Sequence, residues 1–218
     1  MIDIVTVTTS NYTSLFNIFR DSLKLDVNKH LNLVAYEVDV SQFDTFGFQK
    51  PSWYHVIRQK QIKLLGHLNK LRPGEYAVFS DSDIQFIQPH RLHELVDLAR
   101  RHNLEYFGMR EAHHYEYNGG FCIVKNTPRI REFYARIIKS LEERDYPFAD
   151  QTVMNDMLIK KKSFELDHAF IDRDFYVWGD NKPTLNTILH HAVCSTTTDG
   201  KIQQLSRVRE RCRSIGLV

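Results

Sequence analysis

The sequence contains few cysteines and no stretch dominated by proline, glycine or serine. Its three cysteines, Cys122, Cys194 and Cys212, lie far apart among 218 residues and form no Cys-x-x-Cys pair. This number and spacing argue against both a disulfide framework and a structural zinc site. Because no internal repeat or low-complexity segment interrupts the chain, the sequence does not divide into modules joined by a linker.

Long apolar runs and an excess of one charge are also missing. No stretch approaches about 18 consecutive apolar residues, so we expect no membrane-spanning helix. The first residues lack the basic region and the cleavage site of a secretory signal. A net charge of +2 is too small to indicate nucleic-acid binding. Basic residues gather in the segment 201–218, where a solvated helix face is favoured over weak contact with phosphate or a membrane surface.

The composition is that of an ordinary globular domain. Hydrophobic residues make up 42% of the chain and charged residues 26%, which fits one domain over residues 1–218. Patterns typical of strands and helices alternate through the first half, and this favours an α/β fold with a mostly parallel central sheet. We expect helices at 13–25, 51–71, 89–101, 128–143 and 149–159, and strands at 2–8, 31–38, 76–79, 84–87, 105–109, 120–125, 164–166, 169–171 and 187–193.

Two carboxylates, Asp81 and Asp83, directly follow the predicted buried strand at 76–79. Hard anionic oxygens at this spacing suit Mn²⁺ or Mg²⁺, whose other ligands can be phosphate oxygens. The simpler alternative is a turn that merely uses Asp and Ser. Phosphatases of the haloacid dehalogenase type also place Asp-x-Asp after a strand and use the first Asp as nucleophile. Their motif continues with Thr or Val where this chain has Gln85, so that interpretation is disfavoured.

Two further polar clusters occur in the second half of the chain. Asn118, Gly119 and Gly120 precede an apolar strand, where glycines allow either a close approach to a ligand or a hairpin turn. Asp150 and Gln151 open a predicted helix. Asp150 can cap that helix, and the pair can also present a carboxylate and an amide to sugar hydroxyls.

A histidine pair, His190 and His191, lies on the last predicted strand. Neighbouring residues on a strand face opposite sides, so only one of the two can point at a given site. A histidine beside the Asp-x-Asp motif would be a borderline-soft third ligand, better suited to Mn²⁺ than to Mg²⁺.

Taken in order, these motifs resemble those of GT-A-fold glycosyltransferases, the nucleotide-sugar enzymes that carry an Asp-x-Asp motif. The likeness is greatest to glycosyltransferase family 34, and families 8 and 77 have a related motif order. The resemblance implies a Rossmann-like three-layer sandwich, with a nucleotide-binding half at 1–110, a donor-sugar and acceptor half at 111–200 and a basic tail at 201–218. The matching stretches are 79–83, 118–126, 150–151 and 190–194.

The resemblance also implies a metal-dependent, retaining transfer of a sugar from a UDP-sugar to a hydroxyl of a carbohydrate or glycoconjugate. The metal, Mn²⁺ or Mg²⁺, would be bound by Asp81, Asp83 and His190, with His191 as the alternative to His190. Asp81 would also lie near the ribose or donor sugar. If the reaction were inverting, Asp150 would be the first candidate for general base.

Other matching residues would contact the two substrates. Those implied along the donor sugar and around its anomeric carbon are Asn118, Gly119, Gly120, Asp150 and Gln151. Those implied for uracil, ribose and diphosphate are Thr8, Asn11 and Tyr12, together with Arg58 or Lys60 on the following helix.

The chain also departs from the family pattern. Val193 replaces the glycine after the histidine, and Lys201 is only a distant candidate for the lysine that follows the histidine in family 8. The family's membrane anchor and stem are missing, so we expect a soluble cytoplasmic enzyme, viral or bacterial, or one domain of a larger protein. Two other function classes stay open, namely a different metal-dependent phosphoryl-transfer or hydrolytic enzyme and a non-catalytic sugar- or nucleotide-binding module.

Overall fold

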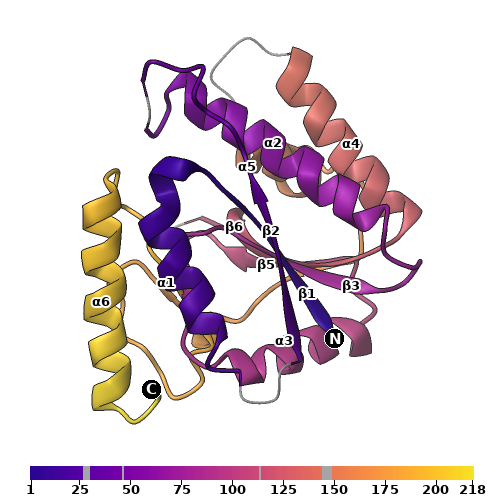
Figure 1. Cartoon of the computed structure of the whole chain (residues 1–218). Coiled ribbons are helices and arrows are strands. Elements are labelled where there is room, and N and C mark those ends of the chain that lie inside the picture. Colours follow the sequence, from indigo (N-terminus) through magenta and orange to yellow (C-terminus); the bar gives the residue numbers. More distant parts are fainter. Residues whose placement is uncertain (27–29, 46, 113, 144–148) are drawn as a thin grey trace.

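The computed structural model describes residues 1–26, 30–45, 47–112, 114–143 and 149–218 (Figure 1). Its centre is a six-stranded sheet with the order β2-β1-β3-β6-β5-β7. All neighbours pair in parallel except at β6, which is antiparallel to both β3 and β5. This confirms the mostly parallel sheet. The strands are β1 (Ile2–Thr8), β2 (Leu31–Glu37), β3 (Tyr76–Ser80), β5 (Tyr106–Arg110), β6 (Tyr117–Lys125) and β7 (His168–Phe170).

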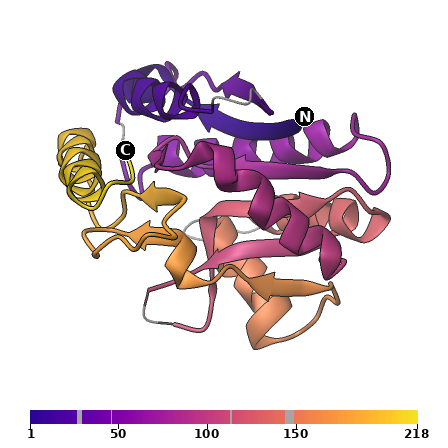
Figure 2. The same cartoon turned by 90° about the horizontal axis from the view of Figure 1, so that it is seen from below.

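Helices cover both faces of this sheet, which explains why β1 and β3 carry apolar residues on both faces. Ile4 and Val5 alternate between the faces, and each is buried in a different apolar cluster. Figure 1 shows α2 and α4 side by side, and Figure 2 shows α3 crossing the opposite face. One layer holds α1 (Thr13–Leu23) and α3 (Leu92–Arg101), and the other holds α2 (Pro51–Leu68), α4 (Pro128–Glu143) and α5 (Asp150–Asn155).

A second, three-stranded sheet consists of β4 (Ile84–Phe86), β9 (Leu189–His191) and β8 (Tyr176–Trp178), in the order β4-β9-β8. β4 begins just after the Asp-x-Asp turn and pairs antiparallel with β9, which sets Ile84 opposite His191. This pairing brings residues that are more than a hundred positions apart in sequence to the same end of the main sheet.

The basic tail forms α6 (Thr198–Ser214), which packs beside α1 (Figures 1 and 2). Leu205 packs against Leu15 and Ala192, while Val208 and Cys212 join a separate small cluster. These buried residues are spaced by three or four positions, the spacing of one helix face. The arginines occupy the other face, and Arg207 and Arg211 contact Asp180.

Some element boundaries differ from the sequence predictions. The strand predicted at 164–166 is not a strand, and only β7 forms in that region. β8 was not predicted, because its three residues are too short to show an alternating pattern. Within the described ranges, no helix combines the length and the apolar character that crossing a membrane requires.

If α6 is anchored through its apolar face, Leu205→Ala will lower the free energy of unfolding by about 2–4 kcal/mol, as expected for a buried leucine. Chemical denaturation measures this difference. Glu210→Ala on the exposed face of the same helix is the control and should change stability by less than about 0.5 kcal/mol. Equal effects of the two substitutions would contradict the packing of α6.

Candidate active site

A cavity of about 620 Å³ opens where β1 and β3 end and α2 begins. Parallel strands commonly place ligands beyond their carboxyl ends. Because β6 runs antiparallel, its first residues reach the same cavity. The predicted site residues that line the cavity are Thr8, Asn11, Tyr12, Lys60, Asp81, Asp83, Asn118, Gly119, Gly120, Asp150, Gln151 and His191.

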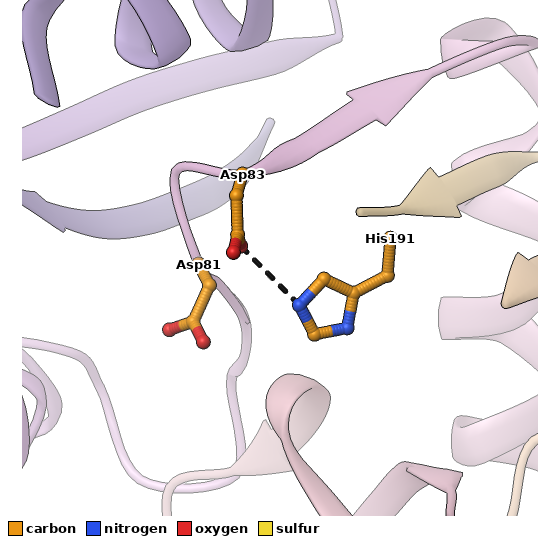
Figure 3. Close-up of side chains that lie close together, drawn as sticks. All are labelled: Asp81, Asp83 and His191. Atoms are coloured by element: carbon orange, nitrogen blue, oxygen red, sulfur yellow. Dashed lines mark ion pairs between the residues drawn. The ribbon is translucent and has the colours of Figure 1, made fainter. Parts of the chain in front are cut away.

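Asp81, Asp83 and His191 form a cluster whose potential ligand atoms all lie within 4.8 Å of one another (Figure 3). Nε2 of His191 is 3.2 Å from Oδ1 of Asp83. Apart from this ion pair, Oδ1 of Asp83 has no hydrogen-bond partner among the described residues, and neither has Nδ1 of His191. Two carboxylates and an imidazole whose potential ligand atoms lie this close together fit a divalent cation with mixed O and N ligands.

The structure corrects the preference for His190 as the third residue of this cluster. Gln85 Nε2 donates to Nδ1 of His190 at 2.9 Å, and Nε2 of His190 donates to the Gly179 carbonyl at 2.8 Å. Both ring nitrogens are therefore used, and burial lowers the pKa of His190 to about 4. His191, its neighbour on β9, faces the opposite side and reaches the carboxylates.

Gly120 is needed where β6 passes the histidine ring. A Cβ at this position would lie 2.3 Å from Cε1 of His191 and 2.9 Å from Oδ1 of Asn118. The Gly120 carbonyl accepts a 2.7 Å hydrogen bond from the backbone of Asp81. The glycine thus lets β6 hold the Asp-x-Asp turn and the imidazole together.

Lys60 joins this cluster to Asp150. Its Nζ lies 2.9 Å from Oδ2 of Asp150, 3.3 Å from Oδ1 of Asp81 and 3.1 Å from the Gly119 carbonyl. Burial would lower the pKa of Lys60, but the two carboxylates outweigh burial and raise the pKa above its usual value. The lysine is therefore a fixed positive charge between two acidic groups.

Lys201 approaches Asp83 from the first turn of α6 and contacts Oδ2. Burial alone would raise the pKa of Asp83, but Lys201 and His191 outweigh it and hold the pKa well below its usual range. Asp83 is thus a carboxylate that stays charged although it is buried.

Gln151 connects α5 to the first residues of β6. Its Oε1 accepts hydrogen bonds from the backbone of Gly119 at 2.9 Å and from Nδ2 of Asn118 at 3.2 Å. Its Nε2 lies 3.4 Å from Oε1 of Glu111, which also lines the cavity. Glu111 was not among the predicted site residues. Its sequence signal, a single acidic residue just after a strand, is too common to be specific.

Asp150 accepts hydrogen bonds from three donors. Besides Lys60, the Gln61 side chain donates to Oδ2, and the backbone of Gln151 donates to Oδ1 at 2.7 Å. A buried carboxylate with these partners is held in one orientation. Asp150 therefore fixes the position of Lys60 and of the start of α5.

A protein-family model described as nucleotide-diphospho-sugar transferase matches residues 20–205. The chain belongs to the nucleotide-diphospho-sugar transferase family. The match covers most of the chain and includes every residue of the Asp81, Asp83 and His191 cluster. It confirms the glycosyltransferase assignment and disfavours a phosphatase or a phosphoryl-transfer enzyme.

Solved structures show the same fold for this transferase. It resembles a glycosyltransferase involved in glycosylation of the major capsid of PBCV-1, with 14% identity, a TM-score of 0.68 and coverage of 95% of this chain and 99% of that one. It also resembles the glycosyltransferase GlyE of Streptococcus pneumoniae, with 12% identity and a TM-score of 0.60. That match covers 100% of this chain and 65% of GlyE. A third similar structure is that of the galactosyltransferase LgtC in complex with donor and acceptor sugar analogs. Its sequence identity is 11% and its TM-score 0.57, and the match covers 100% of this chain and 97% of that one. These matches confirm the GT-A fold. No curated protein matches the sequence.

The sequence left Arg58 and Lys60 as alternatives for the nucleotide, and of the two only Lys60 lines the cavity. Arg58 does not line the cavity, and its guanidinium pairs with Glu142 on α4. Residues two positions apart on a helix do not share a face. Since Lys60 points into the cavity, Arg58 points away, and Lys60 is the residue of this pair that can meet a nucleotide.

The close packing at Gly120 gives a direct test of the cluster. Gly120→Ala will push His191 from the carboxylates and lower the free energy of unfolding by about 1–3 kcal/mol, as overpacking does. The matched control is Gly66→Ala in α2, where a Cβ meets nothing within 4 Å and about 0.5–1 kcal/mol of added stability is expected. Denaturant titration compares the two. A Gly120→Ala protein as stable as Gly66→Ala would argue against this arrangement.

Proposed function

We propose that this chain transfers a sugar from a UDP-sugar to a hydroxyl of a carbohydrate acceptor, with a divalent cation bound by Asp81, Asp83 and His191. The observation that carries the proposal is the cluster of two carboxylates and one imidazole that lines the cavity, with potential ligand atoms within 4.8 Å of one another. Because one ligand is an imidazole nitrogen, Mn²⁺ is preferred to Mg²⁺, which takes oxygen ligands.

The donor would lie across the cavity from the end of β1 to the start of β6. Thr8, Asn11 and Tyr12 line the end next to β1, where the family resemblance puts uracil and ribose. Gly119 and Asn118 line the end next to β6 and would face the sugar. Residues 1–110 would then supply most nucleotide contacts, and residues 111–200 the donor-sugar and acceptor contacts.

The chemistry follows from charge. A sugar that leaves a nucleotide diphosphate builds negative charge on the β-phosphate, and a bound divalent cation would offset that charge as a Lewis acid. Lys60 adds a fixed positive charge beside Asp81. Gln151 holds Asn118 and Gly119 in place and turns its Nε2 toward Glu111. The amide and the Glu111 carboxylate can hydrogen-bond the sugar hydroxyls.

Retention of anomeric configuration is part of the proposal, and it rests on the family resemblance. The contacts of Asp150 agree with it, because three donors already occupy this carboxylate. An inverting reaction would need a free base beside the acceptor hydroxyl, and Asp150 is positioned as a partner of Lys60 instead.

The acceptor would enter over aromatic side chains at the cavity rim. Phe48, Trp53 and Trp178 line the cavity, and Phe48 is half exposed. Aromatic faces of this kind pack against the apolar faces of sugar rings. The related LgtC structure holds donor and acceptor sugar analogs, which supports a carbohydrate as acceptor.

The metal cluster can be tested by calorimetric titration of UDP with and without Mn²⁺. Asp83→Asn and His191→Ala should each weaken Mn²⁺-dependent UDP binding at least about tenfold, because each removes one ligand. Asp97→Asn, an exposed carboxylate on α3, should bind as the unaltered protein does. UDP binding that never depends on Mn²⁺, in any of these proteins, would refute the proposed metal site.

The role of Gln151 in catalysis can be distinguished from a role in nucleotide binding by measuring the slow hydrolysis of a panel of UDP-sugars alongside UDP affinity. Gln151→Ala should reduce kcat about 10–100-fold through lost positioning, while UDP affinity stays within about twofold. Gln203→Ala on the exposed face of α6 is the control and should keep full activity. An equal loss of UDP affinity in Gln151→Ala would place this residue with the nucleotide rather than with the sugar.

A further inference from the structure

Two lysines contact the same carboxylate cluster, but they are held very differently. Lys60 has three acceptors, on Asp81, Asp150 and Gly119, and its side chain is 9% exposed. Lys201 is 17% exposed, and Oδ2 of Asp83 is its one hydrogen-bond acceptor among the described residues. Lys60 is therefore locked in place, whereas a single contact holds Lys201.

The helix that carries Lys201 does not depend on this contact. α6 is anchored by Leu205 and Val208 in apolar clusters and by Arg207 on Asp180. Its N-terminus is capped by the side chain of Thr197, which accepts from the backbone of Gly200. A lysine on a flexible four-carbon stem can leave Asp83 while the helix stays where it is.

Lys201 and a metal ion would need the same carboxylate. Asp83 is nearly buried, and its two oxygens face Lys201 on one side and His191 on the other. A divalent cation drawn to Oδ1 and His191 would be repelled by an ammonium group on Oδ2 of the same carboxylate, in surroundings where water screens little.

We propose that Lys201 is a displaceable cation of the metal site, which balances Asp83 in the metal-free protein and withdraws into the cavity when a metal binds. This inference rests on the proposed metal site. Metal binding and the Lys201–Asp83 contact are then linked equilibria, so each weakens the other by the same factor. Lys201 thereby lowers the metal affinity of the free protein and stabilises its metal-free fold.

The test titrates Mn²⁺ into the full metal-free chain without nucleotide and follows free Mn²⁺ by electron paramagnetic resonance. Lys201→Met keeps the apolar stem and removes the charge, and it should bind Mn²⁺ at least about fivefold more tightly than the unaltered protein. Lys201→Gln, a neutral variant that can still hydrogen-bond Asp83, should shift affinity in the same direction. The control Lys139→Met, on the exposed face of α4, should bind Mn²⁺ as the unaltered protein does.

Thermal unfolding gives a second readout that requires no activity. Without metal, Lys201→Met should unfold at a lower temperature than the unaltered protein, because Asp83 loses its buried partner. With Mn²⁺, the variant should show the larger rise in melting temperature, since tighter binding adds more stability. Lys139→Met should show neither change.

Each outcome separates this inference from the proposed function. Equal or weaker Mn²⁺ binding by both Lys201 variants, with binding by the unaltered protein intact, would overturn the displacement and leave the metal site standing. Mn²⁺ binding by the Lys201 variants alone would show that the ion cannot displace Lys201 in the natural chain, which would overturn the inference and leave the proposed function to the UDP titration with Mn²⁺. No Mn²⁺ binding by any protein, in this titration and in the titration with UDP, would overturn both.

Discussion

The structure depends on balancing three carboxylates that share one cavity. Asp81, Asp83 and Asp150 meet beyond the ends of the strands, where burying an unpaired charge would cost several kcal/mol. Lys60 offsets two of them at once, and Lys201 offsets the third. The cavity can therefore exist in a folded chain before any ligand arrives. Its polar residues are set in place by their partners rather than by a bound substrate.

Topology supplies these partners from all parts of the chain. The antiparallel strand β6 inserts between β3 and β5, so Gly120 can bond the backbone of Asp81. The small sheet sets β9 beside β4 and carries His191 to the same turn. α2 contributes Lys60 from its middle, and α6 contributes Lys201 from its first turn. Each of these contacts joins residues far apart in the sequence. Each of them reaches the turn 81–83, which connects β3 to β4.

Local patterns in the sequence were enough for the scaffold and for the two aspartates. β1 is a β-branched, largely apolar run, α2 and α4 have apolar residues at helical spacing, and Asp-x-Asp after a buried strand is a local arrangement. The sequence was least decisive where a shift of one or two positions changes which side chain faces the site. His190 and His191 exchange faces with a shift of one position on β9, and Arg58 and Lys60 lie on different faces of one helix. Neither choice can be made without knowing the neighbouring element, β4 for the histidines and α4 for Arg58.

The same charge balance links metal and donor in the proposed reaction. Three carboxylates and two ammonium groups leave the cluster with one net negative charge when His191 is neutral, the form in which a histidine binds a metal. This charge attracts a cation and repels a nucleotide diphosphate. A divalent cation offsets this charge and offers the diphosphate a direct positive partner. Metal and donor should therefore bind cooperatively, because each supplies the charge that the other lacks.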